Sequence, residues 1–472
     1  MATFQSDLPD LTAPKKPAGL ASVYVETYGC QMNVYDSQAI NGLLEREGYH
    51  LVNHDLEADV VLLNTCSIRD LAEHKIVSRV GDLRHRRIQT NMPQPLIGIC
   101  GCMAERMGTD LHRGKRKIDL VVGVDSYDTL PGLLNDLLAK QDQEGRRTTA
   151  DKKARTMIGH RNDAHYVAPP ALYPINNSHL VTIHKGCDYK CTYCIVPLTR
   201  GPQSEKSPEA IIAEIQGIVA GGGQEVTLLG QNVTAYNWQK GMDFAALVEE
   251  VAEIDGLERI RFLTGHPKDM HPHLMDAIGR VEKLCPWLHV PVQSGSDRIL
   301  RRMKRLYNGA EYLEMVDYAR QVIPDVTFST DFIVGFPGET ESEFQDTLEM
   351  ARKVKYDTAF SFKYSERPGV PAAKLADDVP DAEKKRRLAE LIAVQDEVWH
   401  DLATTGVGQV WDGVIEGRAR HQEEHGAAGA WRLRTPNNRK VIVSGGDYEM
   451  GQPLRAKVTG FKNTTFLGTV ED

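Results

Sequence analysis

The sequence predicts an α/β protein with three folded parts: an N-terminal α/β domain, a partial (β/α)6 barrel and a small C-terminal β-barrel. Short apolar runs alternate with amphipathic helical patterns in the first part, and the alternation restarts near Ile175 for six strand–helix units. Repeated units of this kind imply a parallel sheet, which tends to curl into a barrel. The chain ends in β-rich runs separated by turn residues, a pattern typical of a small barrel.

The 472 residues are too many for one hydrophobic core, so several domains are expected. We predict a disordered lead-in over residues 1–21 and an N-terminal domain over 22–140. A polar and charged stretch predicts a linker over 141–172. The barrel domain then covers 173–396, and the C-terminal domain covers 397–472.

Three strand patterns of the N-terminal domain each end in a cysteine: "SVYVETYGC" at Cys30, "ADVVLLNTC" at Cys66 and "PLIGICGC" at Cys102. Open α/β sheets build their sites at the carboxyl ends of strands, so we expect these thiols to share one site. Cys100 lies on the same strand face as Cys102 and could replace it. Cys285 has no cysteine neighbour and is expected to be a small buried hydrophobe.

The barrel domain begins with the strand pattern "HLVTIHKGC". Its first helix has Ser207 as the N-cap and Pro208 at the first position, and Thr340 with Glu343 fits a capping box farther along. A long charged helix over 381–404 precedes the β-rich end. The five further strands are expected in "EVTLLGQN", "IRFLTGHP", "LHVPVQSG", "VTFSTDFIVGFPG" and "DTAFSFKYSERPG".

The stretch "CDYKCTYC" places Cys187, Cys191 and Cys194 on one loop after the first strand of the barrel domain. Three thiolates can hold three corners of an iron–sulfur cube and leave the fourth iron open for a ligand. A structural zinc site needs four ligands, but no fourth cysteine follows nearby, and His184 lies upstream on the strand side. The pattern therefore favours iron–sulfur over zinc.

The composition, 41% hydrophobic and 26% charged, is typical of a globular protein. No apolar run reaches the ~18–20 residues that span a bilayer, and the N-terminus lacks the apolar region of a secretory signal. We therefore expect a cytoplasmic protein whose thiols stay reduced. The net charge of −9 does not favour RNA binding, so any RNA surface must be local. Basic runs at 84–87, 112–117 and 301–305 are expected to be solvated helix faces.

The C-x3-C-x-aromatic-C spacing, with Tyr193 as the aromatic residue, resembles the radical S-adenosylmethionine enzymes. In that family S-adenosylmethionine binds the open iron, and its reductive cleavage yields a radical that removes hydrogen from an unreactive carbon. From about Val23 to its end the chain resembles the methylthiotransferases of this family. The resemblance is carried by the three separated cysteines and by "CTYCIVPLTRG", "PVQSGSDRILRRMKRLY", "DFIVGFPGETE" and "FKYSERPGVPAA".

The resemblance implies two 4Fe–4S clusters and S-adenosylmethionine as cofactors, and an RNA-binding C-terminal module of the TRAM type. The family motif aligns on "GC", which favours Cys102 over Cys100, and no catalytic residue is implied beyond the cluster ligands. The implied ligands are Cys30, Cys66 and Cys102 for one cluster and Cys187, Cys191 and Cys194 for the other. The residues expected to contact S-adenosylmethionine are Tyr193, Gly230, Gln231, His266, Gln293, Ser294 and Asp331. The residues expected to contact RNA phosphates are Arg418, Arg420, Arg432, Arg434, Lys440 and Lys457.

Three kinds of substrate compete within the resemblance: isopentenylated adenosine in tRNA, threonylcarbamoylated adenosine in tRNA and an aspartate of a ribosomal protein. The motifs "YGCQMNVYDS", "NTCSIRDLAE" and "KYSERPG" resemble the first, the MiaB type. This implies methylthiolation of carbon 2 of isopentenylated adenosine 37 in the anticodon loop. Lys185 departs from the arginine often found before "GC", "PQSEKS" follows "TRG" where basic and acidic residues are usual, and "FLTGHP" replaces "FTSPHP". These departures concern contacts to the cofactor and the RNA.

The resemblance also implies two uses of S-adenosylmethionine: methylation of a sulfur at the N-terminal cluster, and radical formation at the other. It implies an electron donor such as a flavodoxin or ferredoxin, and a sulfur donor that the sequence does not identify. We expect a monomer. A non-catalytic RNA-binding protein with structural metal is the alternative from another class, and two separate three-cysteine sets argue against it.

Overall fold

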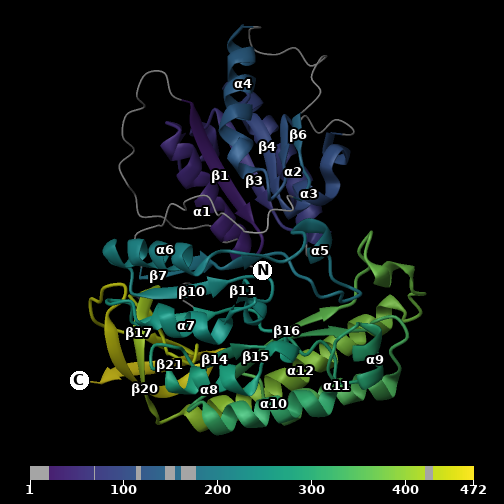
Figure 1. Cartoon of the computed structure of the whole chain (residues 1–472), viewed down its shortest axis with the longest axis vertical. Coiled ribbons are helices and arrows are strands. Elements are labelled where there is room, and N and C mark those ends of the chain that lie inside the picture. Colours follow the sequence, from purple (N-terminus) through teal and green to yellow (C-terminus); the bar gives the residue numbers. More distant parts are fainter. Residues whose placement is uncertain are drawn as a thin grey trace. The chain divides into compact units, whose positions relative to one another are not determined.

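A computed structural model of the chain describes residues 21–67, 70–112, 118–143, 155–160, 177–419 and 429–471. The expected lead-in and most of the expected linker lie outside these residues. The chain forms two compact units (Figure 1). The first unit comprises residues up to 174 together with 184–188 and 195–206, and the second comprises 175–183, 189–194 and 207–472.

The first unit contains a parallel six-stranded sheet with the order β2-β1-β3-β4-β5-β6 (Figure 1). Its strands are β1 (Ser22–Tyr28), β2 (His50–Leu51), β3 (Val60–Thr65), β4 (Leu96–Gly101), β5 (Leu120–Val122) and β6 (Arg155–Met157). The other elements of the unit are α1 (Gln31–Arg46), α2 (Asp70–Gln89), α3 (Cys102–Met107), α4 (Leu130–Gln143), α5 (Val196–Thr199), β8 (His184–Lys185) and β9 (Ser204–Glu205). Strand β6 lies inside the stretch predicted as a linker, and that part of the prediction was wrong. An edge strand needs only main-chain pairing on one side, which a polar composition does not prevent.

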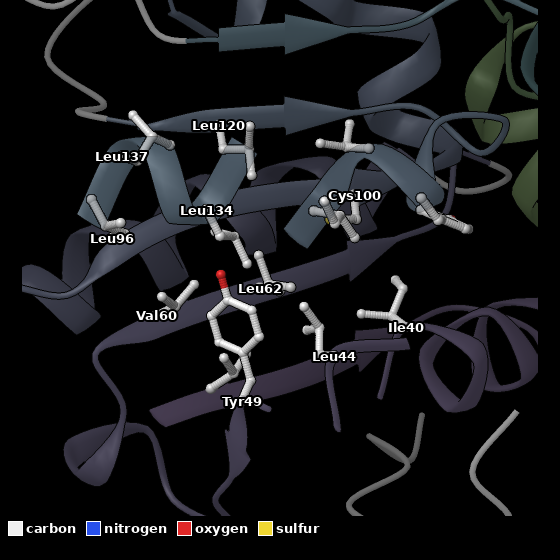
Figure 2. Packing of buried hydrophobic residues seen from close by; sticks show 14 of the residues in the cluster. Ile40, Leu44, Tyr49, Val60, Leu62, Leu96, Cys100, Leu120, Leu134 and Leu137 are labelled. Atoms are coloured by element: carbon white, nitrogen blue, oxygen red, sulfur yellow. The ribbon is translucent and has the colours of Figure 1, made fainter. Parts of the chain in front are cut away.

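Both faces of this sheet are buried, because the residues of β3 alternate between two hydrophobic cores. Val60 and Leu62 belong to one core, and Val61 and Leu63 belong to the other. Cys100 lies in the first core, among the aliphatic side chains shown in Figure 2. Near-continuous apolar strands are expected where helices cover both faces of a parallel sheet.

The second unit confirms the six predicted strand–helix units. Its parallel strands form two sheets of three, β13-β10-β7 and β14-β15-β16. Ile260 and Leu284 form a parallel bridge between them, and the Gly265 N–H donates to the His289 carbonyl. The strands are β7 (Ser178–Thr182), β10 (Glu225–Leu229), β13 (Arg259–Phe262), β14 (Trp287–His289), β15 (Thr327–Val334) and β16 (Thr358–Lys363). The connecting elements are α6 (Pro208–Ala220), β11 (Asn237–Trp238), β12 (Met242–Asp243), α7 (Phe244–Ala252), α8 (Pro272–Arg280), α9 (Asp297–Arg302), α10 (Gly309–Val322) and α11 (Glu341–Val354).

The predicted helix caps are confirmed. The Ser207 hydroxyl accepts from the Ala210 N–H at the start of α6, and Thr340 with Glu343 closes a reciprocal capping box on α11. Each cap satisfies N–H groups that have no partner within the helix. Within the described residues no helix is both long and apolar enough to cross a bilayer.

The C-terminal part forms the predicted closed barrel, with the strand order β17-β18-β19-β21-β20. Its strands are β17 (Val410–Arg418), β18 (Trp431–Arg434), β19 (Lys440–Val443), β20 (Pro453–Lys462) and β21 (Thr465–Glu471). The predicted boundary at residue 396 falls inside α12 (Asp381–Gly406), which is one continuous helix. Gln395 donates to the Tyr356 carbonyl, whereas Trp399 and Ala403 pack in the core of the closed barrel. A single helix therefore contributes to both cores.

Within the second unit the closed barrel contacts the amino ends of the parallel strands. The fully buried Arg261 of β13 donates to the carbonyls of Pro436 and Thr435, at 2.7 and 3.0 Å. The hydroxyl of Thr327, the first residue of β15, donates to the Asn437 carbonyl at 2.7 Å. These contacts leave the carboxyl ends of the strands to form a site.

Candidate functional site

Cys30, Cys66 and Cys102 lie together at the carboxyl edge of the first sheet. Strands β1, β3 and β4 are paired in register to their ends, and each cysteine follows the last paired residue by one or two positions. A hydrogen bond joins the side chains of Cys66 and Cys30, and Cys102 interacts electrostatically with Cys30. The structure thus brings together the three thiols that were expected to share one site.

Two of these thiols have shifted pKa values. The hydrogen bond with Cys66 lowers the pKa of the Cys30 thiol to about 6, against the effect of burial and with help from the Arg200 charge. Cys30 is also the N-cap of α1, where helix N–H groups favour a negative charge. Burial raises the pKa of the Cys102 thiol, although Arg200 opposes the shift. The thiolate is the form of cysteine that binds metal, and the lowered pKa of Cys30 favours that form.

Two glycines allow the chain to approach this edge closely. A Cβ on Gly29 would lie 2.8 Å from the Cβ of Cys66 and 2.4 Å from Oδ1 of Asn33. Gly101 has φ +89°, and a Cβ there would lie 2.6 Å from the Thr65 carbonyl oxygen. Gly29 precedes Cys30, and Gly101 precedes Cys102. A side chain at either position would clash with the neighbouring segment, so both positions require glycine.

Two buried asparagines fix the segments that carry Cys30 and Cys66. The Asn33 amide donates to Asn64 Oδ1 and to the Thr65 carbonyl, both at 3.2 Å. In return the Asn64 amide donates to the Asn33 carbonyl at 2.8 Å and to the Ser37 hydroxyl at 2.9 Å. A buried network with satisfied partners is rigid, so it holds the two thiols in place.

Arg200 and Asp36 form a buried ion pair beside Cys102. Arg200 Nη2 lies 2.6 Å from Asp36 Oδ2, and Arg200 Nε donates to the Cys102 Sγ at 3.2 Å. The side chains of Arg200 and Asp36 are 5% and 4% exposed. Sequence analysis assigned no role to either residue, although Arg200 stands in the "LTRG" motif. Their separation of 164 residues left no local signal of the pairing.

Cys100 shares the hydrophobic core of Cys102. Its side chain is fully buried in the hydrophobic core of Figure 2, and burial raises the pKa of its thiol to about 12. Cys102 differs from Cys100 in that its Sγ accepts a hydrogen bond from Arg200 Nε at 3.2 Å. Cys285 is also buried, and burial raises its pKa.

The three cysteines of "CDYKCTYC" are divided between the two units. Cys187 belongs to the first unit, and its N–H donates to the Gly201 carbonyl at 3.2 Å. Cys191 and Cys194 belong to the second unit, where the Cys194 N–H donates to the Cys191 carbonyl at 3.1 Å. Arg305 Nη1 donates to the Cys191 Sγ at 3.4 Å. Arg305 belongs to the basic run 301–305 that was expected to be a solvated helix face, and that prediction was wrong for Arg305, whose side chain is buried.

His266, at the carboxyl end of β13, is 5% exposed and held from several sides. Its ring stacks on Tyr189 of the cysteine loop, with centroids 4.0 Å apart and planes 8° apart. Its Nδ1 accepts from the Lys268 N–H at 3.1 Å, so Nε2 carries the proton of the neutral ring. Burial, together with the charges of Arg305 and Lys268, lowers the pKa of His266 to about 2. Nε2 is buried without a hydrogen-bond partner, so it is a donor available to a ligand.

The other strand-end residues predicted to contact the cofactor lie after β10 and β14 or within β15. Gln231 Oε1 is buried without a partner, and Gln293 has φ +72°. The Gln293 N–H donates to the Asp331 carbonyl at 2.9 Å. The Ser294 hydroxyl is fully buried and accepts from the Ser296 N–H. Gly230 follows β10 directly. Tyr193 lies on the cysteine loop, where burial raises the pKa of its hydroxyl.

No group of three His, Cys, Asp or Glu side chains in the described part of the chain is arranged to bind a single metal ion. An iron–sulfur cube makes a different demand, because each of its irons takes one thiolate and the ligands need not share an ion. Converging thiols, a lowered thiol pKa and glycines without room for a Cβ fit such a cube at the N-terminal site.

Comparison with known proteins agrees with this arrangement. The Radical SAM superfamily matches residues 181–351, and "Uncharacterized protein family UPF0004" matches residues 22–123. A tRNA-2-methylthio-N(6)-dimethylallyladenosine synthase of Chloroherpeton thalassium is 38% identical over 95% of this chain and 96% of its own length. The synthase of the same name from Symbiobacterium thermophilum is 42% identical over 84% of each chain.

The chain belongs to the radical S-adenosylmethionine methylthiotransferases of this type. As a methylthiotransferase of this family it uses two 4Fe–4S clusters and S-adenosylmethionine. Among solved structures, the radical S-adenosylmethionine methyltransferase TsrM of Kitasatospora setae superposes with a TM-score of 0.53 at 13% identity, over 75% of this chain and 74% of that one. The cobalamin-dependent enzyme OxsB gives 0.53 at 11% identity, over 81% and 56%. These two likenesses concern the fold alone.

Proposed function

We propose that this methylthiotransferase acts on tRNA and methylthiolates carbon 2 of an adenosine that carries a dimethylallyl group. The observation that carries the proposal is the identity of 35–42% with synthases of that name, over 84–97% of this chain. The target would be adenosine 37 of the anticodon loop. Loop bases are the RNA targets that proteins can splay out and read, and chemistry on a base requires that it leave the stack.

We assign the cluster ligands as Cys30, Cys66 and Cys102 at the N-terminal site, and as the three cysteines of "CDYKCTYC" at the other. When bound, these clusters together with S-adenosylmethionine supply the hydrogen-abstracting radical and the methylthio group. The support for the first set is their convergence and the lowered pKa of Cys30. The support for the second is its spacing on a loop that Thr192 anchors, because its N–H and hydroxyl bond to the carbonyls of Met303 and Arg302 at 3.0 Å.

The protein's part in the reaction is to bind, orient and exclude water. The neutral His266 would donate its Nε2–H to an acceptor of S-adenosylmethionine, and Gln231 Oε1 would accept from a donor group of the same molecule. Gly230 has no side chain and would allow S-adenosylmethionine to approach the main chain closely. The backbone turn at Gln293 would shape the edge of the cofactor site together with Asp331 and Tyr193. Ser294 would contribute indirectly, because its hydroxyl already holds the Ser296 N–H.

We propose that the closed barrel binds tRNA phosphates through a smaller set of residues than the sequence indicated. Arg432 and Arg434 both pair with Glu416, and Arg434 also lies 3.6 Å from Glu225. Arg420 lies outside the described residues. Arg418 and Lys457 also pair with carboxylates, Asp447 and Glu471, but both pairs are exposed, and the two basic side chains are 49% and 52% exposed. They remain the best candidates together with the exposed Lys440.

The remaining assignments follow from the proposed reaction. A tRNA substrate and eight free cysteines favour the cytoplasm. An electron donor such as a flavodoxin or ferredoxin would supply electrons to the cluster at which the radical forms. We also propose that the protein is a monomer. We also propose that the chain comprises an N-terminal domain, a barrel domain and a TRAM-like domain. The boundary between the last two shifts to the end of α12.

Mass spectrometry of nucleosides from total tRNA, with and without the gene, tests the proposal. We expect the 2-methylthio-dimethylallyl nucleoside to disappear and the unmethylthiolated one to accumulate. Loss of the methylthio group from the threonylcarbamoyl nucleoside would instead identify the other tRNA substrate. Unchanged tRNA would contradict the proposal and direct attention to a ribosomal-protein aspartate.

A further inference from the structure

Two buried arginines each donate a hydrogen bond to a sulfur of one thiol site. Arg200 Nε lies 3.2 Å from the Cys102 Sγ, and Arg305 Nη1 lies 3.4 Å from the Cys191 Sγ. Arg200 is 5% exposed and Arg305 is 8% exposed. Burial of a guanidinium costs free energy unless its charge and N–H groups have partners, so the partners of these two arginines are informative.

The two guanidinium groups are held rigidly but differ in their charge balance. Arg200 makes a two-point contact with the Asp36 carboxylate, which neutralises its charge. Arg305 donates to the Tyr307 hydroxyl and to the Pro291 carbonyl, both at 2.9 Å. No carboxylate pairs with Arg305 among the residues that the structure describes. The partners of Arg305 are the Cys191 sulfur, a hydroxyl and a carbonyl, so they do not balance its charge as Asp36 balances that of Arg200.

We propose that Arg305 and Arg200 are positioning residues that set the reduction potentials of the two clusters. An N–H donor to a ligand sulfur stabilises the electron-rich reduced state, and hydrogen bonds to sulfur and net charge are the levers by which proteins tune such potentials. Because the charge of Arg305 is not neutralised, its effect exceeds that of Arg200. The inference rests on the cluster ligands assigned under the proposed function.

The test uses the full-length protein, reconstituted anaerobically and titrated with dithionite while reduction is followed by electron paramagnetic resonance. In R305M we expect the Cys191 cluster to become at least tenfold harder to reduce, which is about 59 mV for a one-electron couple. The N-terminal cluster should keep its potential. In R200M the pattern reverses, and the shift is smaller.

Several variants keep the test decisive. R200M/D36N removes both charges, so no lone carboxylate is left buried if R200M fails to fold. R305K and R200K retain the charge but lose the fork of donors, and we expect intermediate potentials. R298M serves as the matched control, because Arg298 pairs with Glu343 at a 45% exposed position and its hydrogen bonds involve no sulfur.

The outcomes separate this inference from the ligand assignment. A C30A/C66A/C102A variant should lose one cluster by iron content, and if it keeps both, the ligand assignment is wrong. If that variant behaves as expected but R305M and R200M keep wild-type potentials, the arginine proposal is overturned. A shift of both potentials in R298M would overturn it too, because removal of any positive charge would then suffice.

Discussion

The ring of His266 lies flat against the ring of Tyr189, with centroids 4.0 Å apart. Tyr189 is fixed in turn by its hydroxyl, which donates to Asp269 Oδ1 at 2.6 Å. The main-chain N–H of His266 donates to Asn232 Oδ1 at 2.8 Å, and the side-chain amide of Asn232 donates to the Asp269 carboxylate. A residue of the cysteine loop and a residue at the end of β13 are thus joined in one rigid assembly, with His266 Nε2 left for a ligand.

We expect His266→Ala to weaken the binding of S-adenosylmethionine about fivefold, because one hydrogen bond from a neutral donor contributes roughly 1 kcal/mol. Equilibrium dialysis with the reconstituted protein measures this. His273→Ala is the control, since the His273 side chain is 57% exposed and pairs with Asp243. Equal affinity in both variants would exclude His266 from the cofactor site.

His266 should also make stability depend on pH. Its pKa is lowered to about 2 in the folded protein, whereas an unfolded histidine titrates near 6.5. Below pH ~6.5 the unfolded state therefore binds the extra proton, and the free energy of unfolding falls by up to about 1.4 kcal/mol per pH unit. Urea unfolding at several pH values should give a shallower dependence for His266→Gln than for the wild type. Identical slopes would mean that His266 titrates normally.

Cys100 and Cys102 should respond differently to substitution. Cys102→Ala should remove one cluster, measured as iron content and visible absorbance after reconstitution. Cys100→Ala should keep the iron and lower the free energy of unfolding by about 1 kcal/mol, because it leaves only a small cavity in the core of Figure 2. Loss of iron in Cys100→Ala alone would reverse the ligand assignment.

Gly101→Ala should be strongly destabilising. A left-handed backbone and a Cβ at 2.5 Å from Asn64 Oδ1 combine a conformational cost of about 1–3 kcal/mol with a steric one. Gly132 is the matched control, because it lies in α4 with open space around its Cα. There alanine should stabilise the protein by about 0.5–1 kcal/mol. Thermal unfolding of the two variants should therefore shift in opposite directions.

Removal of Arg418 or Lys457 should weaken tRNA binding and lower the slope of log K against log salt by about one each. Both side chains are about half exposed on the closed barrel. Arg280→Ala on α8, where the side chain is 66% exposed, should leave the slope unchanged. Fluorescence anisotropy with a labelled anticodon stem-loop at several salt concentrations measures the slopes. An unchanged slope in all three variants would exclude this face of the barrel.

The order of the domains and the N-terminal thiols that meet could be predicted from local patterns in the chain. Apolar runs that end in Cys30, Cys66 and Cys102 could be read locally, because parallel strands in one sheet end at the same edge. The six strand–helix units and the helix caps at Ser207 and Thr340 could also be predicted. Each signal lies within a few neighbouring residues.

The side chains that surround those thiols could not be predicted in this way, because they come from distant parts of the chain. Arg200 reaches Cys102 across 98 residues and Asp36 across 164, and Arg305 reaches Cys191 across 114. Strand β6 and the long reach of α12 were likewise missed, because their partners are distant in the chain. Hydrophobic periodicity specifies which face of an element is buried, but it does not specify which buried charge meets which sulfur. That choice depends on the packing of segments whose separation leaves no pattern in the sequence.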